Sequence, residues 1–521
     1  MPDRRPPLPL WAALIVAALG GLALDLSFPS AGTWPLAFVA VGMSLVTLIG
    51  RRAGAAFLVG LVFGAAFYFP HIDWAASFLG DNELAWVPWV ALAGLESLFM
   101  GLGAIPIALA YHWTDRVRGG ARLIAVPVLV SGLWTAREIA MGSWPYGGFA
   151  WGRIGMAMSE APLAEAASWV GVSGLSFLCV LWAAMLVELG RFAARTRGAG
   201  PRRARALAVL PALGLIAALV LVPQFPTTPV GTIRVGAVQG NGPAAYMDDR
   251  EYLDVLRAQL AATRELEGQD VDVVLWPEGG VDGDPRADER VARVLDDVVR
   301  DYDAPLLMNA ASAVGDDIFN MSMLWTQDGP AQTHSKRHPV AFGEYVPDRA
   351  FFEAIVPSLI QMIGREYTPG TDSPVIDVGG VPIGLAICFD VVADGLIREG
   401  VFDGAQAYMF QTNNADFRGT DENLQQLAFA RMRAIETGRS VVNLSTVGTS
   451  QVIAPDGTTI DQIGVDEAGA IVADVELREG LTAGVVSGQA IVWILLIGSP
   501  LALVGVFIAR RRPRSQAAEA S

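Results

Sequence analysis

Two scarce residue types lie close together in the second half of this sequence. Cys388 is one of two cysteines among 521 residues, and Lys336 is the only lysine among 37 basic residues. A chain that uses arginine almost everywhere else has an ammonium here, and guanidinium differs from it in shape, hydration and ability to lose a proton. Taken singly, the cysteine can be a small buried hydrophobe and the lysine a chance surface residue. Together they favour covalent catalysis with Cys388 as nucleophile.

The apolar run before Cys388 predicts the element that positions the thiol. Residues 381–388 read as a buried strand, and Gly384 inside it allows close backbone packing. A polar residue, Asp390, follows closely after the thiol. A strand end that delivers a side chain into a cleft is where α/β folds place chemistry.

A carboxylate occupies a similar position in an earlier strand. Residues 271–276 are predicted to form a strand, and Glu278 follows it in the run Trp276-Pro277-Glu278-Gly279-Gly280. A thiol needs a base to become the thiolate, and a partly buried carboxylate with a raised pKa can act as that base. An acyl transfer also needs a positive donor at the developing oxyanion, which a fixed Lys336 would supply.

The four histidines do not indicate a metal centre. His334 and His338 flank Lys336, but no acidic or cysteine ligands follow them at the usual spacing. We therefore expect neither a metal nor a cofactor.

The composition predicts a membrane protein. Hydrophobic residues make up 52% of the chain and the mean hydropathy is +0.40. Eight apolar stretches are long enough for a bilayer core of about 30 Å. They cover residues 10–26, 34–50, 53–70, 84–110, 122–141, 170–190, 206–222 and 488–509. We expect a membrane domain over residues 1–222 with seven of the helices, the eighth at 488–509, and a tail at 510–521.

Arginines predict the orientation of these helices. Alternate connections and both ends are rich in arginine: Arg4, Arg5, Arg51, Arg52, Arg116, Arg118, Arg122, Arg191, Arg195, Arg197, Arg202, Arg203, Arg205, Arg510, Arg511, Arg512 and Arg514. The connection at 71–83 instead holds three acids. By the positive-inside rule, both termini are cytoplasmic and residues 223–487 lie outside.

Residues 230–485 are predicted to form an extracytoplasmic α/β domain. They carry 41 acidic and 18 basic residues, which argues against binding nucleic acid. Strands are expected at 233–239, 271–276, 305–313, 319–326, 381–388, 406–412, 441–447 and 449–454, and helices at 249–266, 287–299 and 421–438. Asp456-Gly457 indicates a hairpin. This alternation predicts a layered domain with mixed sheets.

Two carboxylates fall inside predicted membrane helices. Glu96 and Glu138 are expected to face the interior of the bundle or a polar cavity, although Glu138 is also near enough to a helix end to reach the interface. The connection at 142–169 is rich in Trp, Pro and Gly. We read it as an outward-facing re-entrant or interfacial segment; a simple aromatic anchor is the alternative.

The combination of these motifs resembles a known family. Glu278, Lys336 and Cys388, in this order, are similar to the Glu-Lys-Cys triad of the nitrilase or carbon–nitrogen hydrolase superfamily. The predicted membrane helices make the resemblance more specific. Together with the triad they are similar to the bacterial apolipoprotein N-acyltransferase family, and this similarity covers nearly the whole chain. The supporting runs are Ala237-Val238-Gln239-Gly240-Asn241, Phe342-Gly343-Glu344-Tyr345-Val346-Pro347, Gln426-Leu427-Ala428 and Arg431-Met432-Arg433-Ala434.

The resemblance implies a nitrilase-like αββα sandwich on an eight-helix bundle. It assigns Glu278 as base, Lys336 as oxyanion stabiliser, Cys388 as nucleophile and Glu344 as a second carboxylate. The implied donor is a phospholipid and the implied acceptor is the α-amino group of the lipidated N-terminal cysteine of an apolipoprotein. The implied location is the bacterial inner membrane, with the catalytic domain outside, and we expect a monomer.

The sequence departs from the family pattern near the nucleophile. The family's Tyr-Glu after the cysteine is Phe389-Asp390, and its Asn-Ala-Trp-Phe run is Asn414-Ala415-Asp416-Phe417. The proline of its Val-Pro-Phe-Gly-Glu run is Ala341. Phe389, Asp390, Asn414 and Phe417 are therefore candidate supporting or substrate-binding residues whose contacts are open.

Two other functions remain open from the sequence. A membrane-tethered amidase or nitrilase would use water as acceptor. A divergent lipid- or protein-binding homologue without catalysis is suggested by Phe389, Asp390 and Asp416, and the three triad positions argue against it.

Overall fold

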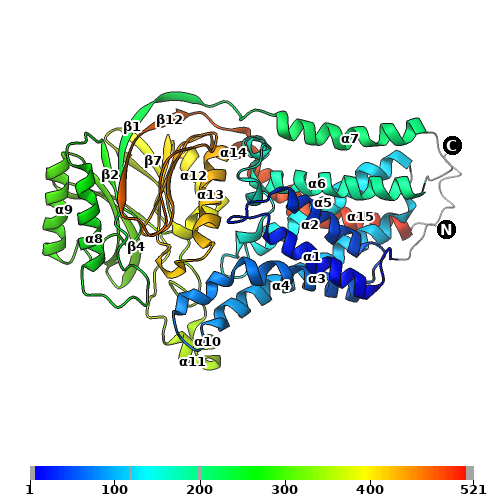
Figure 1. Cartoon of the computed structure of the whole chain (residues 1–521), viewed down its shortest axis with the longest axis horizontal. Coiled ribbons are helices and arrows are strands. Elements are labelled where there is room, and N and C mark those ends of the chain that lie inside the picture. Colours follow the sequence, from blue (N-terminus) through cyan, green and yellow to red (C-terminus); the bar gives the residue numbers. More distant parts are fainter. Residues whose placement is uncertain (1–5, 118, 196–201, 512–521) are drawn as a thin grey trace. The chain divides into compact units, whose positions relative to one another are not determined.

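A computed structural model describes residues 6–117, 119–195 and 202–511 (Figure 1). Arg4, Arg5, Arg118, Arg197 and the predicted tail from residue 512 on lie outside the described residues. The chain divides into two compact units. The first contains residues up to Asp73, Trp89–Pro223 and the residues from Ser487 on; the second contains Trp74–Pro88 and Gln224–Val486.

The first unit is built from apolar helices. They are α1 (Leu10–Asp25), α2 (Pro35–Leu48), α3 (Ala53–His71), α4 (Trp86–Trp113), α5 (Arg122–Met141), α6 (Ala167–Arg195), α7 (Arg202–Leu221), α14 (Ala483–Trp493) and α15 (Ser499–Arg511). Small residues let helices approach closely where no water drives their association. At Gly60 of α3, an added Cβ would lie 2.7 Å from the carbonyl oxygen of Met100 in α4.

Every apolar stretch predicted to span a membrane is helical in the structure. Among the described residues, five helical stretches are long and apolar enough to cross a membrane: Ala53–His71, Trp86–Arg116, Arg122–Met141, Ala164–Ala194 and Ala483–Arg511. The other three predicted spans coincide with shorter apolar helices, Leu10–Asp25, Pro35–Leu48 and Leu207–Leu221. The protein therefore has several candidate spans, and the count of eight stays a prediction.

The two carboxylates within the apolar helices lie inside the first unit. Glu96 is 2% exposed and Glu138 is 6% exposed, and Glu138 Oε1 accepts a hydrogen bond of 2.8 Å from Trp134 Nε1. Of the two positions considered for Glu138, the interior is the one observed. The connection after α5 consists of short 3₁₀ turns with many buried residues, and its placement at a membrane interface stays a prediction.

The second unit contains two six-stranded sheets. One has the order β12-β1-β2-β3-β4-β5 and the other β11-β10-β9-β8-β7-β6. The strands are β1 (Thr228–Gln239), β2 (Val273–Leu275), β3 (Leu306–Val314), β4 (Asp317–Thr326), β5 (Gly329–Ser335), β6 (Val375–Val378), β7 (Val381–Ile387), β8 (Ala407–Thr412), β9 (Val441–Ser445), β10 (Ser450–Ile453), β11 (Thr459–Ile463) and β12 (Gly469–Glu479).

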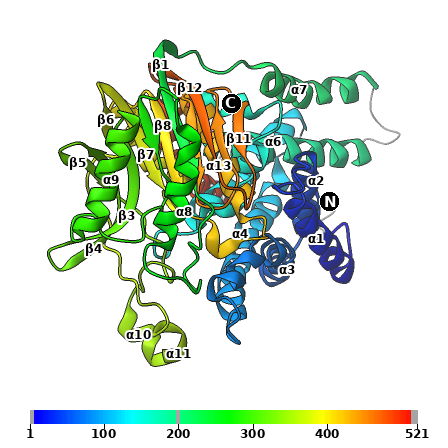
Figure 2. The ribbon, with the colours of Figure 1, turned by 60° about the vertical axis from the view of Figure 1, so that its left-hand side comes forward.

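The sheets pack face to face with helices on their outer sides (Figures 1 and 2). The core between them takes alternate residues from both sheets, such as Val235 and Leu275 from one and Leu385 and Met409 from the other. On the far side of the first sheet a second core holds α8 (Asp254–Thr263) and α9 (Glu289–Tyr302). The helices α12 (Asp394–Phe402) and α13 (Glu422–Thr437) cover the second sheet. Four layers of this kind form an αββα sandwich.

Gly384 has the role predicted for it in strand β7. An added Cβ there would clash with the ring of Tyr408 on the neighbouring strand β8. The bare backbone leaves room for that ring, whose edge also meets Gly400 of α12. The strand that ends at the nucleophile is therefore packed against β8 and α12 without a gap.

Strand direction brings the chemical residues to one end of the sandwich. β1, β2 and β3 are parallel, and β4 and β5 continue the sheet as antiparallel neighbours, so β5 runs in the same direction as β3. In the other sheet β7, β8 and β9 are parallel. Glu278, Lys336, Cys388 and Asn414 each lie one to three residues beyond the carboxyl end of one of these strands.

The predicted strands and helices of this unit all occur, with shifted ends. The predicted helix 249–266 begins only at Asp254, after Leu253 in a left-handed conformation with φ of 70°. The sequence reading missed β5, β6, β12 and α12, as well as the short helices α10 (Arg349–Ile355) and α11 (Pro357–Ile360). The three missed strands lie at sheet edges. Of these, β5 carries few apolar residues, β6 is only four residues long, and β12 alternates buried apolar residues with more exposed ones.

Candidate active site

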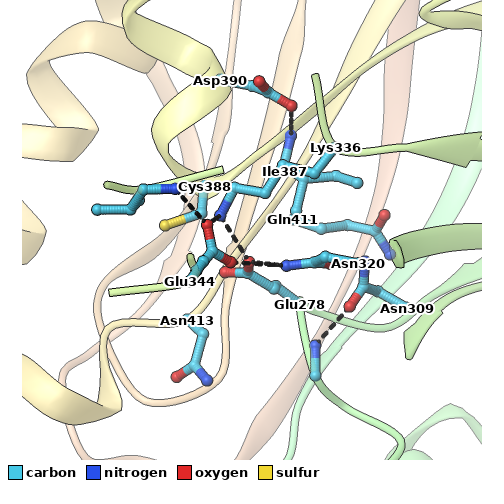
Figure 3. Close-up of polar contacts among 12 residues, drawn as sticks. Glu278, Asn309, Asn320, Lys336, Glu344, Ile387, Cys388, Asp390, Gln411 and Asn413 are labelled. Atoms are coloured by element: carbon cyan, nitrogen blue, oxygen red, sulfur yellow. Dashed lines mark hydrogen bonds and ion pairs between the residues drawn. The ribbon is translucent and has the colours of Figure 1, made fainter. Parts of the chain in front are cut away.

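Cys388 sits at a sharp turn between strand β7 and a 3₁₀ helix, η8 (Cys388–Val392) (Figure 3). Its φ of 50° is in the left-handed region, which residues with a side chain rarely adopt. Such strain persists only where the surroundings hold the residue in place, and it concentrates at functional sites. The turn presents the partly buried thiol at the strand end, as the sequence predicts.

Lys336 is fully buried and holds two carboxylates together. Its Nζ lies 3.1 Å from Glu278 Oε1 and 2.8 Å from Glu344 Oε2. Lys336 is 1% exposed, Glu278 6% and Glu344 7%. In Figure 3 these side chains converge beside the Cys388 sulfur. The structure therefore brings together the three residues predicted for catalysis and the second carboxylate.

The charges of this cluster determine the protonation states available for catalysis. Burial, opposed by Lys336 and assisted by Glu344, raises the pKa of Glu278. Burial alone would lower the pKa of Lys336, but Glu278 and Glu344 hold it well above its ordinary value, so the ammonium stays charged. Burial and the neighbouring Glu278 raise the pKa of the Cys388 thiol, and Lys336 opposes this. The resting thiol is protonated, next to a carboxylate that is a stronger base than usual.

Two buried asparagines orient the carboxylates, and the sequence reading missed both. Asn320 Nδ2 donates to Glu278 Oε1 at 2.7 Å and to Glu344 Oε1 at 3.1 Å. Asn309 Nδ2 donates to Asn320 Oδ1 at 2.9 Å, and Asn309 Oδ1 accepts from the Gly279 amide at 2.8 Å. The available signal was a polar residue inside each of two apolar strands, β3 and β4.

Family models match both halves of the chain. The apolipoprotein N-acyltransferase N-terminal domain matches residues 20–185, and the carbon-nitrogen hydrolase domain matches residues 234–480. The apolipoprotein N-acyltransferase of Mycolicibacterium smegmatis is 32% identical over 95% of this chain and 85% of the relative. This chain belongs to the apolipoprotein N-acyltransferase family. It is a bacterial membrane enzyme that N-acylates lipoproteins, and its second unit has the nitrilase-like α/β fold.

Other members of the apolipoprotein N-acyltransferase family match over similar lengths. The enzyme of Shewanella oneidensis is 26% identical over 96% of this chain and 96% of its own length. The enzyme of Azotobacter vinelandii is 29% identical, and the match covers 91% of each chain. The family implies a phospholipid acyl donor and a lipoprotein acceptor.

Asp390, one of the departures from the N-acyltransferase pattern, ties two catalytic segments together. Its Oδ1 accepts from the His338 amide at 2.8 Å and lies 2.9 Å from His338 Nδ1. Its Oδ2 accepts from the Arg337 amide at 3.2 Å and the Ile387 amide at 3.4 Å. Burial acts to raise the pKa of Asp390, but the hydrogen bond and charge of His338 lower it below its ordinary value. The shorter side chain still fixes the residues that follow Lys336 to the end of β7.

Two of the remaining candidates, Asn414 and Phe417, lie in the loop after β8, and the third, Phe389, lies in η8. Asn414 Nδ2 donates to Glu422 Oε2 at 2.7 Å and to Gln426 Oε1 at 2.8 Å. The Phe417 ring packs edge-on against Trp74, with centroids 5.1 Å apart. Phe389, directly after the nucleophile, is half-buried.

Asp416, the charge that replaces a family aromatic, caps a backbone amide. Its Oδ1 accepts from the Tyr246 amide at 2.6 Å. Burial, opposed by this hydrogen bond, raises the pKa of Asp416. Trp74 and Tyr246 thus bring the segments 74–88 and 241–253 against this loop, a relationship that the sequence did not indicate.

The two histidines beside Lys336 make contacts with neighbouring segments of the chain. His334 Nδ1 lies 3.1 Å from the carbonyl oxygen of Ser373, and His338 pairs with Asp390. Across residues 6–117, 119–195 and 202–511, no group of three or more His, Cys, Asp or Glu side chains is arranged to hold a metal ion.

Proposed function

We propose that this enzyme transfers the acyl chain in two half-reactions, through a thioester on Cys388. The observation that carries the proposal is the contact of the Lys336 ammonium with both Glu278 and Glu344 beside a strained, partly buried thiol. A fixed cation, a base with a raised pKa and a nucleophile together supply what acyl transfer requires.

In the first half-reaction Cys388 attacks the ester carbonyl of a phospholipid. Glu278 takes the thiol proton as the sulfur–carbon bond forms. Lys336 stabilises the oxyanion of the tetrahedral intermediate. When the intermediate collapses, Glu278 returns the proton to the departing alkoxide, so lysophospholipid leaves and the acyl thioester remains.

In the second half-reaction the α-amino group of the lipidated N-terminal cysteine attacks the thioester carbonyl. The nitrogen–carbon bond forms, the carbon–sulfur bond breaks, and Glu278 accepts the amine proton and passes it to the departing thiolate. The acceptor must be the neutral amine, because an ammonium has no lone pair. Water must be kept from the thioester between the steps, since hydrolysis would release a free fatty acid.

The proposed setting is the bacterial inner membrane. Eight membrane helices are proposed, seven within residues 1–222 and the last at 488–509, with residues 510–521 as a cytoplasmic tail. The catalytic domain, residues 230–485, would be outside and the enzyme monomeric. The arginine pattern and the apolar helices support this arrangement, and a lipid donor and a lipidated acceptor give an amidase-like domain a reason to be membrane-anchored.

Mass spectrometry of purified protein incubated with phospholipid and no acceptor tests the thioester. We expect one added acyl group on the peptide that contains Cys388 and release of lysophospholipid. Cys388→Ala should carry none, whereas Cys179→Ala should still be acylated because Cys179 is buried within α6. Acylation that persists in Cys388→Ala, or lies on Cys179, contradicts the mechanism.

Addition of a diacylglyceryl peptide tests the acceptor. Acyl-peptide should appear as the thioester disappears. Free fatty acid as the main product would instead favour the membrane-tethered hydrolase.

A further inference from the structure

The Cys388 sulfur has a second polar neighbour, on the side of helix α13. Gln426 Nε2 lies 3.5 Å from Cys388 Sγ, within hydrogen-bond reach of a sulfur acceptor. Gln426 is 2% exposed, on the first turns of α13. The proposed mechanism does not require this contact. Gln426 lies on a helix that covers the second sheet, whereas Lys336 follows strand β5 of the first sheet.

The orientation of the Gln426 amide follows from its neighbour Asn414. Asn414 Nδ2 lies between two acceptors, Glu422 Oε2 and Gln426 Oε1, at 2.7 and 2.8 Å. A nitrogen with two N–H groups satisfies both contacts, whereas an oxygen there would face two oxygens. Gln426 therefore turns its oxygen to Asn414 and its NH₂ group to the sulfur.

The orientation of Asn414 is determined in turn by the end of strand β9. Ser445 Oγ accepts from the Gly448 amide at 2.9 Å and lies 2.5 Å from Asn414 Oδ1. Because backbone N–H groups already occupy the hydroxyl oxygen, its single proton is directed to Asn414 Oδ1. Thr412 Oγ1 lies 3.3 Å from the same oxygen. A one-way series of hydrogen bonds thus runs from the backbone through Ser445, Asn414 and Gln426 to Cys388.

We propose that Gln426 is a further catalytic residue that stabilises the Cys388 thiolate by an N–H···S hydrogen bond, with Asn414 and Ser445 as its positioning residues. The proposal rests on the proposed thioester mechanism. It moves no proton: the thiol proton still goes to Glu278, and Gln426 only stabilises the anion left on sulfur.

The electrostatics explain why a neutral donor suits this position. Burial and Glu278 raise the pKa of the thiol, and the Lys336 ammonium that opposes them is shared by two carboxylates. The titratable side chains that act on the sulfur are Glu278, Lys336, Glu422 and Glu344, and each carboxyl group raises the pKa of the thiol only when it is ionised. An amide dipole stabilises the thiolate without adding a net charge to the site. It would act twice, when sulfur attacks the phospholipid and when it leaves the thioester.

The buried Glu422 is consistent with the same arrangement. Burial raises the pKa of Glu422 to about 8, and the hydrogen bond from Asn414 opposes the rise while Glu278 and Asp416 add to it. At neutral pH Glu422 is therefore mainly uncharged and accepts the second N–H of Asn414 without adding negative charge beside the sulfur.

Alkylation of Cys388 by iodoacetamide, followed as a function of pH, tests the proposal without requiring acyl transfer. The full-length protein carries Cys179→Ala, and the comparison is with Gln426→Met, which keeps side-chain length and removes the donor. Hydrogen bonds to charged groups change equilibria by about 10- to 100-fold, so the midpoint of the alkylation profile should rise by about 1 to 2 pH units. Thioester formation at neutral pH should fall by a similar factor.

The adjacent Gln425 provides a matched control. Gln425 is 4% exposed on the same helix and accepts from Trp74 Nε1 at 3.0 Å instead of contacting the sulfur. Gln425→Met removes a buried amide but should leave the alkylation midpoint unchanged. Gln426→Asn, which retains the amide but is one methylene too short to reach the sulfur, covers the case in which Gln426→Met does not fold, and its midpoint should also rise.

An unchanged midpoint in a folded Gln426→Met or Gln426→Asn protein would overturn the proposal and leave Gln426 as a packing residue. The failure of the thioester mechanism is a separate result. In that case the parent protein would form no acyl thioester, while the alkylation profiles would still report the effect of Gln426 on the thiol.

Discussion

The role proposed for Lys336 depends on the shape of its side chain as well as on its charge. It is 1% exposed, and its ammonium contacts two carboxylates within 3.1 Å. A guanidinium carries the same charge but is a larger planar group. No space in a fully buried site accommodates it without moving Glu278 or Glu344.

Lys336→Arg should therefore be nearly as damaging as Lys336→Ala. The loss of one oxyanion donor typically costs about 100- to 1,000-fold in rate. Single-turnover thioester formation in both variants is the measurement. Near-normal turnover in Lys336→Arg would mean that Lys336 supplies charge alone and does not place a donor at the oxyanion.

The raised pKa of Glu278 predicts the pH dependence of acylation. The base acts only when ionised, so a raised pKa moves the acid limb of the profile to a midpoint above the ordinary glutamate value of 4.5. Glu344 contributes to that rise by repulsion. Glu344→Gln should lower the rate, because Lys336 loses a partner, and should also move the acid limb to lower pH. A lower rate with an unmoved limb would show that Glu344 acts only by holding Lys336.

At the scale of elements, the site depends on contacts between the two sheets. These contacts hold the segments that follow their strands together at one end of the sandwich. Lys336 follows an edge strand of one sheet and Cys388 follows an inner strand of the other. Gln411 of β8 also links the sheets, since its Nε2 donates to the carbonyl oxygen of Trp276 at 2.6 Å. Asp390 makes the corresponding link between the Arg337–His338 backbone and the Ile387 amide.

Asp390→Asn should loosen this link. An amide group would place N–H groups opposite backbone N–H groups in a fully buried position, at a cost of about 1 to 3 kcal/mol for the unsatisfied donors. We expect a lower thermal unfolding temperature in detergent, and acylation slower by up to about 100-fold, because a small misplacement of a catalytic group can reduce the rate by that much.

Glu399→Gln is the control for this prediction. Glu399 pairs with the side chain of Arg337 at 3.1 Å but is 40% exposed at its side chain and does not touch the Lys336 backbone segment. The variant should acylate normally. Equal losses in the Asp390 and Glu399 variants would attribute the effect to Arg337.

At the scale of the whole molecule, the arginine pattern predicts the side of the membrane on which catalysis occurs. Asp328, in the turn between β4 and β5, is exposed and is predicted to be outside, whereas Arg52, before α3, is exposed and predicted to be cytoplasmic. Each is replaced by cysteine in a Cys179→Ala, Cys388→Ala background, so that the introduced cysteine is the only thiol in the protein. In intact cells a membrane-impermeant maleimide should label Asp328→Cys and not Arg52→Cys, and lysis should allow both to react. The reverse pattern would contradict the proposed orientation.

The sequence alone was sufficient for features that depend on local composition and residue type. Apolar length predicts helices, alternation and strand ends predict the inner strands, and the scarcity of lysine and cysteine singles out Lys336 and Cys388. The edge strand β5 was missed because its sequence carries few apolar residues, and β6 because it is only four residues long. β12 shows the alternation of a half-buried strand and was overlooked. The resemblance assigned roles to Glu278, Lys336 and Glu344, and the structure shows that the Lys336 ammonium contacts both carboxylates.

Tertiary structure alone decided which polar side chains complete the site. Asn309 and Asn320 look like ordinary polar residues within apolar strands and were missed. Asn414 was a supporting candidate and Gln426 belonged to a run that carried the resemblance, but the contacts of neither were predicted. Asn309 and Asn320 meet across the antiparallel pair β3 and β4, and Asn414 meets Gln426 of helix α13 at the end of β8. Buried amides must then find hydrogen-bond partners, and only the three-dimensional arrangement determines which donors face the carboxylates and the sulfur.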